Sequence, residues 1–169
     1  ADDRSMLFVD IFNTLSLLKI NVKEAQLHKT KNNKVLEVIK ILDHNGESIA
    51  DPFRIEKIIS RVKEVISGVE VMKKPSSPRF VKNFDNTPVV EFLSTPKPNK
   101  TLLRINALDD PLFIEEICNV FKHQQLTIHS ARMSTLGESS ENVFSISSKD
   151  NEAISAEGKK ELAALLINK

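Results

Sequence analysis

Residues 126–137, L-T-I-H-S-A-R-M-S-T-L-G, decide the fold because their first eight positions repeat the pattern of an earlier stretch. Residues 20–27 read I-N-V-K-E-A-Q-L, and both stretches alternate apolar and polar side chains, the period of a strand with one buried face. The same offset of 106 residues aligns residues 3–27 with the second half without a gap. The chain is therefore predicted to contain two copies of one structural unit.

Each copy also carries two helical patterns and a second strand. Ahead of the repeated strand, apolar residues are spaced as one helical stripe in each copy: Phe8, Ile11, Phe12 and Leu15, then Ile114, Ile117, Cys118 and Phe121. After it, residues 35–42 and 143–147 are β-prone and predict a hairpin. A second helix should begin after the cap Asp51 and stop at Gly68, and its counterpart should begin near Ser155.

The order strand, helix, strand, strand, helix predicts an α+β fold with two ferredoxin-like βαββαβ units in tandem, given right-handed crossovers. The second unit has a clear leading strand at residues 101–107. The first has none, because the sequence begins at Ala1, where that strand should end. We therefore expect the chain to be a fragment of something longer.

The domain organisation follows from a proline-rich segment in the middle of the chain. We place a first domain at residues 1–70, a connector at residues 71–100 and a second domain at residues 101–169. Two short apolar segments predict strands within the connector, near residues 80–84 and 89–93. A connector strand could fill the edge of the second unit, which shows no final strand of its own.

Composition narrows the class of protein. No apolar run reaches the length of a membrane span and the N-terminus lacks the layout of a secretion signal, so a cytoplasmic protein is expected. The 24 Lys and Arg against 23 Asp and Glu give no electrostatic case for binding a polyanion. Cys118 is the only cysteine, and its apolar neighbours predict a core residue rather than a reactive thiol.

The motifs of the second copy resemble a known family. The sequence L103-R-I-N-A-L-D-D-P-L-F-I, then residues 126–138, then E141-N-V-F, is similar to the last ACT domain of bifunctional PII uridylyltransferase/uridylyl-removing enzymes. That pattern runs as a strand, D-R-P-G-L-L, a helix, I-H-S-A-x-I-x-T-L-G-E and D-V-F. The first copy, with D3-R-S-M-L-F, resembles the preceding ACT domain.

The resemblance implies a non-catalytic regulatory region. In the family, an upstream nucleotidyltransferase domain uridylylates the PII nitrogen-regulatory protein, an upstream HD hydrolase domain removes UMP, and the tandem ACT domains are thought to sense glutamine. The implied partners are an amino-acid effector, expected to be glutamine, the catalytic domains of the same polypeptide, PII as substrate of the whole enzyme, and a second copy in a dimer through the ACT sheets. No catalytic residue, metal or cofactor is expected in this chain, and Mg²⁺ is implied only for the upstream domains.

The resemblance also supplies candidate effector-binding residues, in the two loops before the first helix of each copy and on the repeated strands: Asp3, Arg4, Ser5, Met6, Asn21, Asp109, Asp110, Pro111, Leu112, His129 and Ser130. In the family, the glycine of D-R-P-G lets the ligand approach free N–H groups at a helix N-terminus. Met6 and Leu112 stand at the glycine positions here, where a side chain would crowd that approach. Asp110 adds negative charge where the family has arginine.

His129 is the residue with several interpretations. A simple alternation places it on one strand face with Thr127 and Ala131, and places Ile128 with Ser130 on the other. It has no carboxylate or nucleophile beside it in sequence that would support a role as a catalytic base. It therefore lines an effector or domain interface, or faces solvent on an ordinary strand.

Two other functions fit the same fold. The lost glycines favour a purely structural or dimerisation module that binds no ligand. An RNA-binding α/β sandwich would need aromatic side chains on the central strands, and Phe144 is the one suitably placed. The near-neutral charge and the absence of Trp and Tyr argue against RNA.

Overall fold

The computed structural model describes residues 7–30, 32, 34–68 and 87–168. Its elements in chain order are α1 (Leu7–Leu17), β1 (Asn21–Lys29), β2 (Val35–Leu42), α2 (Pro52–Ile66), β3 (Val89–Leu93), β4 (Thr101–Leu108), α3 (Pro111–His123), β5 (Thr127–Leu136), β6 (Ser139–Ser147) and α4 (Ala156–Ile167). The strands form one antiparallel sheet in the order β2-β1-β5-β6-β4-β3. The α+β class with tandem βαββαβ-like units is confirmed.

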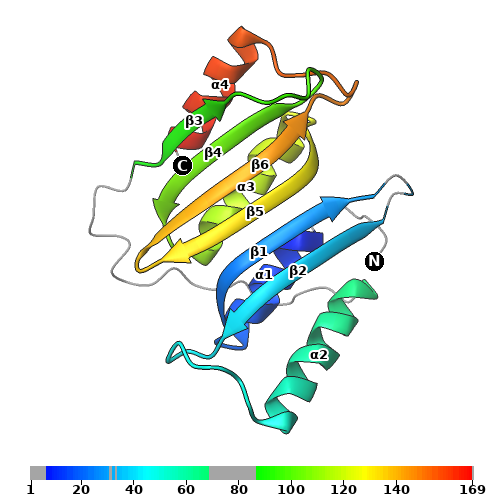
Figure 1. The fold of residues 1–169 in the computed structure, drawn as a ribbon, viewed down its shortest axis with the longest axis vertical. Helices are drawn as coiled ribbons and strands as arrows, with labels where there is room; N and C mark the ends of the chain where they lie inside the picture. Colours follow the sequence, from blue (N-terminus) through cyan, green and yellow to red (C-terminus); the bar gives the residue numbers. More distant parts are fainter. Residues whose placement is uncertain (1–6, 31, 33, 69–86, 169) are drawn as a thin grey trace.

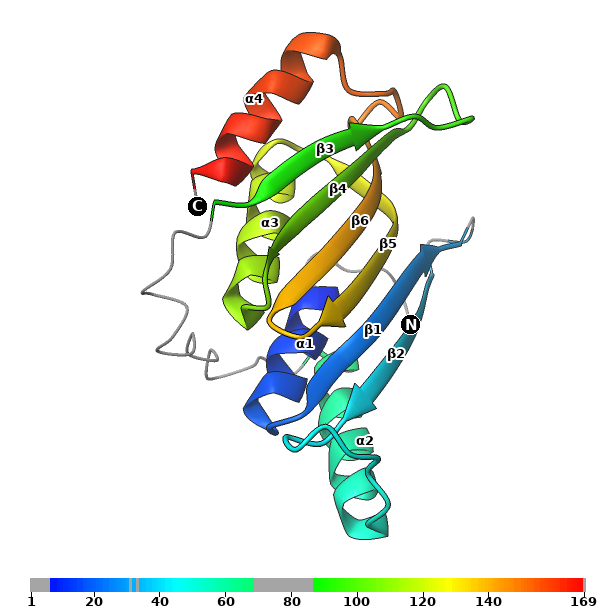
Figure 2. The same ribbon diagram turned by 60° about the vertical axis from the view of Figure 1, so that its left-hand side comes forward.

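The helices cover one face of the sheet or lie beside its outer strands. In Figure 1, α1 and α3 lie behind the sheet, whereas α2 lies beyond β2 and α4 lies beside β3. The turned view in Figure 2 shows α1, α3 and α4 on the same side of the sheet. Each unit therefore has a sheet with helices on one face, and the two sheets join edge to edge through β1 and β5.

Local chemistry explains where the second helices begin and end. Asp51 is the N-cap of α2, and its Oδ1 accepts a hydrogen bond from the backbone N–H of Phe53 at 3.1 Å. Gly68 follows the helix with a φ of +94°, a left-handed conformation that glycine adopts without a Cβ penalty. α4 begins directly after Ser155, as predicted, and the Ser155 Oγ caps it by accepting a hydrogen bond from the backbone N–H of Gly158 at 3.1 Å.

The outer edge of the second unit is occupied by β3, which comes from the connector. Val90 of β3 stands opposite Ile105 of β4 in an antiparallel pair. The predicted connector strand near residues 89–93 is thus confirmed, and it fills the edge that the unit leaves open. The strand predicted near residues 80–84 lies outside the described residues.

One apolar core runs beneath the sheet and is built from both copies. Phe8 and Leu27 from the first copy belong to the same buried cluster as Phe121 and Phe144 from the second. The rings of Phe121 and Phe144 meet edge to face with centroids 5.2 Å apart. Phe144 is 0% exposed under α3, so the stacking platform required for RNA binding is not present at this residue.

Both copies carry a β-bulge at the same position of the repeated strand. β1 has a register shift between Val22 and Glu24, and β5 has one between Ile128 and Ser130. The extra residues of these β-bulges, Lys23 and His129, are 106 residues apart. The bulge thus belongs to the repeated unit rather than to either copy.

The bulge corrects the predicted alternation on β5. Ile128 stands opposite the buried Ile146, and Ala131 stands opposite the buried Phe144, so both lie on the helix-covered face. A simple alternation separates these two residues and is wrong, because the extra residue at His129 shifts the phase by one.

The contact between the copies has approximate two-fold symmetry. Gln26 of β1 stands opposite Arg132 of β5, and these two positions are related by the offset of 106. On either side, Ala25 faces Met133 and Leu27 faces Ala131, which again are pairs that the offset exchanges. An antiparallel pair of equivalent strands is an isologous contact, with its axis between Gln26 and Arg132.

We expect Phe144→Ala to lower the free energy of unfolding by about 3–5 kcal/mol, because it leaves a cavity where α3 meets the sheet. Phe53→Ala is the matched control: Phe53 is 83% exposed, and its loss should change the free energy by no more than about 0.5 kcal/mol. Urea denaturation followed by circular dichroism measures both. Equal effects of the two substitutions would contradict the described core.

Candidate functional site: the pocket between the two copies

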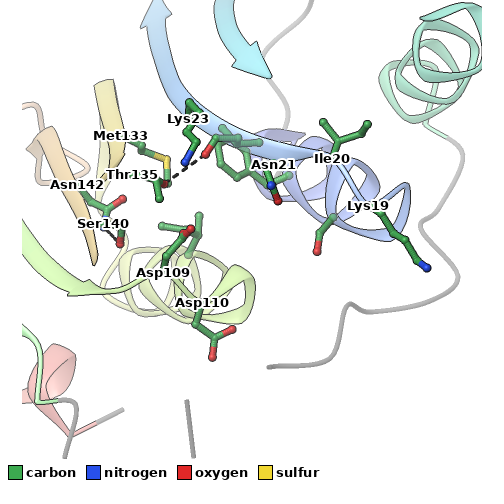
Figure 3. A pocket seen from close by; sticks show the side chains of 14 residues that line it. Lys19, Ile20, Asn21, Lys23, Asp109, Asp110, Met133, Thr135, Ser140 and Asn142 are labelled. Carbon is green, nitrogen blue, oxygen red and sulfur yellow. Dashed lines mark hydrogen bonds between the residues drawn. The ribbon is translucent and has the colours of Figure 1, made fainter. Parts of the chain in front are cut away.

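A pocket of about 140 Å³ opens where the two copies meet. The first copy contributes the end of α1 and the start of β1, and the second contributes the ends of β4 and β5 and the start of β6. Its polar lining includes Lys19, Asn21, Lys23, Asp109, Thr135 and Asn142. Figure 3 shows Lys23 reaching from β1 and Asp109 from the end of β4 toward the same space.

The β-bulge in β1 positions the cation of this pocket. Lys23 is the extra residue of the bulge, so it departs from the regular alternation of side chains along β1. Next to it, the Thr135 hydroxyl of β5 donates a hydrogen bond to the Val22 carbonyl at 3.2 Å. This bond joins the two copies at the pocket wall, because the ladder between β1 and β5 ends at Glu24 and Ser134.

Asp109 is the anion of the pocket, and the residue as a whole remains exposed to solvent, although its carboxyl is partly desolvated. Burial raises the pKa of its carboxyl above the ordinary value of 3.8, while Lys23 and a hydrogen bond from Thr135 lower it and Asp110 raises it further. The backbone N–H of Asp109 donates to the Glu138 carbonyl at 2.8 Å, which fixes the loop between β4 and α3. The pocket thus contains a cation and an anion from different copies.

Asn142 provides an acceptor with no protein partner. The residue is 0% exposed, and its Nδ2 donates to the Ser140 Oγ at 3.1 Å and to the Ile105 carbonyl at 3.4 Å. Its Oδ1 is buried and has no hydrogen-bond partner among the described residues. Leaving such an acceptor unpaired costs about 1–3 kcal/mol. A ligand N–H would satisfy it only after a movement of the pocket wall that exposes this oxygen.

A second pocket, of about 410 Å³, lies at the position related to the first by the two-fold axis. Leu126 and Ile128 line it where Ile20 and Val22 line the first pocket, and Glu37 lines it where Asn142 does. Cys118 also lines it, and burial raises the pKa of this thiol to about 12. The predicted core role of Cys118 is confirmed. The two pockets share a location but differ in chemistry.

The structure brings some of the candidate residues together. Asn21, Asp109 and Asp110 all line the first pocket, and the Asn21 Nδ2 donates to the Asp43 carbonyl at 2.9 Å. Pro111 and Leu112 begin α3, but their side chains are not described, so crowding by Leu112 stays a prediction. The residues of the first loop, Asp3, Arg4, Ser5 and Met6, lie outside the described part of the chain.

His129 and Ser130 line neither pocket. The His129 Nε2 lies 2.9 Å from the Lys100 Nζ and 2.9 Å from the Ser147 Oγ, and Lys100 also contacts Asn151. Burial lowers the pKa of His129, and Lys100, Lys29 and Lys97 lower it further. A neutral His129 accepts a hydrogen bond from the Lys100 ammonium. This contact fixes the start of β5 to the loop before β4.

The pocket residues that the sequence analysis missed include Lys23, Thr135 and Asn142. One signal for Asn142 was present, because it alternates with Phe144 and Ile146 and is thus a polar residue at a core position. Lys23 and Thr135 carried no comparable signal. Their roles depend on a bulge and on the pairing of strands from different copies.

Other kinds of site find no support in the described part of the chain. Within residues 7–30, 32, 34–68 and 87–168, no group of three or more His, Cys, Asp or Glu side chains could hold a metal ion. No helix there is long and apolar enough to cross a membrane.

The fold and the pocket define an α+β protein of tandem ferredoxin-like units with a polar site at their junction. Comparison with curated proteins finds similarity to proteins named bifunctional uridylyltransferase/uridylyl-removing enzyme. The one from Idiomarina loihiensis is 27% identical over 95% of this chain, that from Vibrio parahaemolyticus 28% over 99%, and that from Pseudomonas putida 30% over 92%. No protein-family profile and no solved structure matches.

The chain is homologous to the C-terminal region of these enzymes, which is their ACT region. It spans only about a fifth of their length, 18% in the Idiomarina relative and 19% in that from Vibrio parahaemolyticus. The resemblance of the sequence motifs is thereby confirmed.

We expect Asp109→Asn to stabilise the protein slightly at pH 7 and so to raise the melting temperature, an effect that solvent screening keeps small because the residue is exposed. The folded pKa of Asp109 lies above its unfolded value, so wild-type stability falls as the pH rises through that range, and the substitution removes the loss. Below pH 3.8 the carboxyl is mostly protonated in both states, and the difference should shrink.

Melting temperatures across pH 3 to 8 measure this effect, with Asp150→Asn at an exposed turn as control. A stabilisation by Asp109→Asn that is larger at pH 3 than at pH 7 would show that burial does not control this carboxyl.

Proposed function

We propose that this chain is the regulatory region of a PII uridylyltransferase/uridylyl-removing enzyme. The pocket of about 140 Å³ between the two copies binds an amino acid, with glutamine as the expected effector. This binding sets the balance between uridylylation and deuridylylation of PII. The proposal rests on the homology to the ACT region of enzymes bearing that name, and on the polar groups that meet at the junction.

The chemistry of the pocket suits a zwitterion that carries a carboxamide. An α-carboxylate is complementary to the Lys23 ammonium, and an α-ammonium is complementary to the Asp109 carboxylate. The Asn142 Oδ1, buried and without a protein partner, suits the N–H₂ of a side-chain amide. Rejection of glutamate follows, because its second carboxylate offers Asn142 an acceptor instead of a donor.

The position of the pocket suggests how binding could be transmitted. Lys23 belongs to the first copy, whereas Asp109 and Asn142 belong to the second, so a bound ligand would hold the two copies together. Such a ligand favours the arrangement in which both sets of groups reach it, which is the differential affinity that a population shift requires. The rest of the polypeptide would sense the change in that arrangement.

A calorimetric screen of amino acids tests the proposal directly. We expect glutamine to give measurable binding, Lys23→Ala to weaken it by about tenfold or more, and Lys40→Ala, at an exposed position of β2, to leave it unchanged. Asn142→Leu, which removes the acceptor, should abolish the preference for glutamine over glutamate, whereas Asn142→Asp, which keeps an acceptor at this position, should retain it.

Absence of binding for every amino acid would contradict the proposal and favour the structural module instead. Leu112→Gly separates two versions of that result. Binding restored by the glycine would identify a sensor lost through crowding at the start of α3, and continued absence would support a module that only joins domains.

A further inference from the structure

A cluster of basic side chains lies at one end of the open face of the sheet, the face away from α1 and α3. The His129 Nε2 lies 2.9 Å from the Ser147 Oγ, and Ser147 follows Ile146, which is buried on the helix-covered face. Successive residues of a strand point to opposite faces, so Ser147 and His129 stand on the open face. His129 is at the start of β5, whereas Thr135, which lines the pocket between the copies, is near its end.

Three segments far apart in the sequence meet at this cluster. The loop between β3 and β4 supplies Lys97 and Lys100, β5 supplies His129, and the loop between β6 and α4 supplies Asn151. Figures 1 and 2 show that both loops extend beyond the same end of the sheet. The Lys100 Nζ lies 2.9 Å from the His129 Nε2 and also contacts the Asn151 side chain. The fold therefore holds an ammonium group against an imidazole.

The described charges that act on His129 are all positive. Burial lowers the pKa of its imidazole, and Lys100, Lys29 and Lys97 lower it further. Burial also lowers the pKa of Lys100, and Lys97 adds to that effect. Among the described residues, the groups in contact with the Lys100 ammonium are an imidazole and an amide oxygen, neither of which is a carboxylate. Cations that repel one another in this way are typical of a site that receives an anion.

Carboxylates and a further histidine belong to the elements around His129. His28 is on β1, which pairs with β5. Asp150 and Glu152 belong to the loop between β6 and α4, where their backbone N–H groups both donate to the Ser148 Oγ at 3.2 Å. Within the described part of the chain, neither carboxylate is among the charges that act on His129. The loop is thus fixed by its own hydrogen bonds, and its acidic side chains do not neutralise the cluster.

One imidazole nitrogen faces both Lys100 and Ser147. The His129 Nε2 accepts a hydrogen bond from the Lys100 ammonium only while it carries no proton. Once protonated, Nε2 donates to the Ser147 Oγ, whose own hydroxyl donates to the Ser148 carbonyl at 2.9 Å. Lys100 then loses its acceptor and faces an imidazolium. An anion placed between the two cations replaces the lost acceptor and neutralises both.

We propose that Lys97, Lys100 and His129 form a binding site for an anion that carries a phosphoryl group, and that this anion binds together with a proton taken up by His129. A phosphoryl group has a charge of about −1.5 to −2 at pH 7 and three acceptor oxygens, so it contacts several cations at once. Lysine ammonium groups bind phosphate as point charges. A carboxylate has a single charge and would leave positive charge in the cluster. The inference does not depend on the proposed function, because the two sites lie at opposite ends of β5.

A nuclear magnetic resonance titration of the histidine side chains, without added amino acid, tests the inference on the 169-residue chain. Sulfate is the first probe, because this dianion does not titrate near neutral pH and any proton taken up belongs to the protein. We expect sulfate to raise the pKa of His129 relative to chloride at the same ionic strength. The variant His129→Gln assigns the resonance, and the His44 resonance is the internal reference.

Binding constants measured by calorimetry test the same coupling from the side of the anion. Coupling is reciprocal, so sulfate should bind about fivefold or more tightly at pH 5 than at pH 8. Lys100→Gln and Lys97→Gln should each weaken binding by about fivefold or more. Among the described residues, the hydrogen bonds of Lys97 are made by its backbone, so this variant keeps the fold intact. Lys149→Gln, at an exposed position after β6, removes an equal charge and should leave binding unchanged.

A His129 titration that is the same in sulfate and in chloride would overturn the inference. Equal weakening by Lys149→Gln and Lys100→Gln would also overturn it, because only the general positive charge would then attract the anion. Inorganic phosphate and glycerol phosphate separate two sources of the phosphoryl group. Binding of both supports a site for phosphate esters, and binding of inorganic phosphate alone supports a site for the free anion. Acetate that binds as tightly as phosphate would contradict the choice of a phosphoryl group.

Discussion

The antiparallel pairing of β1 with β5 is the interaction on which the rest of the structure depends. It joins the two copies into one sheet, and because it opposes equivalent residues it also creates an approximate two-fold axis between Gln26 and Arg132. The ladder is reinforced on the open face, where the Arg132 guanidinium lies 3.6 Å from the Glu24 carboxylate. Beneath it, side chains from both copies form one buried cluster. The junction therefore has a ladder, a shared core and two symmetrically placed pockets.

Two polar groups at this junction lower the stability of the fold, and a purely structural joint between domains would not require them. Asp109 is held in surroundings that oppose its charge, and the Asn142 Oδ1 is buried without a partner among the described residues. An apolar residue at position 142 would remove the second cost, since its neighbours along β6 are Phe144 and Ile146. Polar groups that reduce stability and face a common pocket are typical of a binding site. This is the physical reason to favour a sensor over a domain joint.

The two copies carry different side chains at positions that the two-fold axis relates. The bulge is common to both, but its extra residue is Lys23 at one end of the junction and His129 at the other. Lys23 faces a pocket that contains Asp109, whereas His129 is held by Lys100 and Ser147. An ancestral pair of equal sites would have had the same chemistry at both ends. Among the described residues, the first pocket combines Lys23 and Asp109 with the amide oxygen of Asn142, whereas the second is lined by Lys29, Lys122 and Glu37.

The sequence by itself determined the repeat, the type of each element and several of their ends. Periodicity and turn chemistry are local, so the cap at Asp51, the stop at Gly68 and the strand from Asn21 could be predicted from neighbouring residues. Motif resemblance added Asp109 and Asn21 to the site. Tertiary structure alone decided the bulges and the phase of β5, which depend on the register of each hairpin. It also decided the meeting of Lys23 with Asp109, because that depends on the pairing of β1 with β5, whose residues are more than 100 positions apart. The local sequence pattern does not determine which strand edges pair. The packing of the two copies against each other determines that β1 pairs with β5.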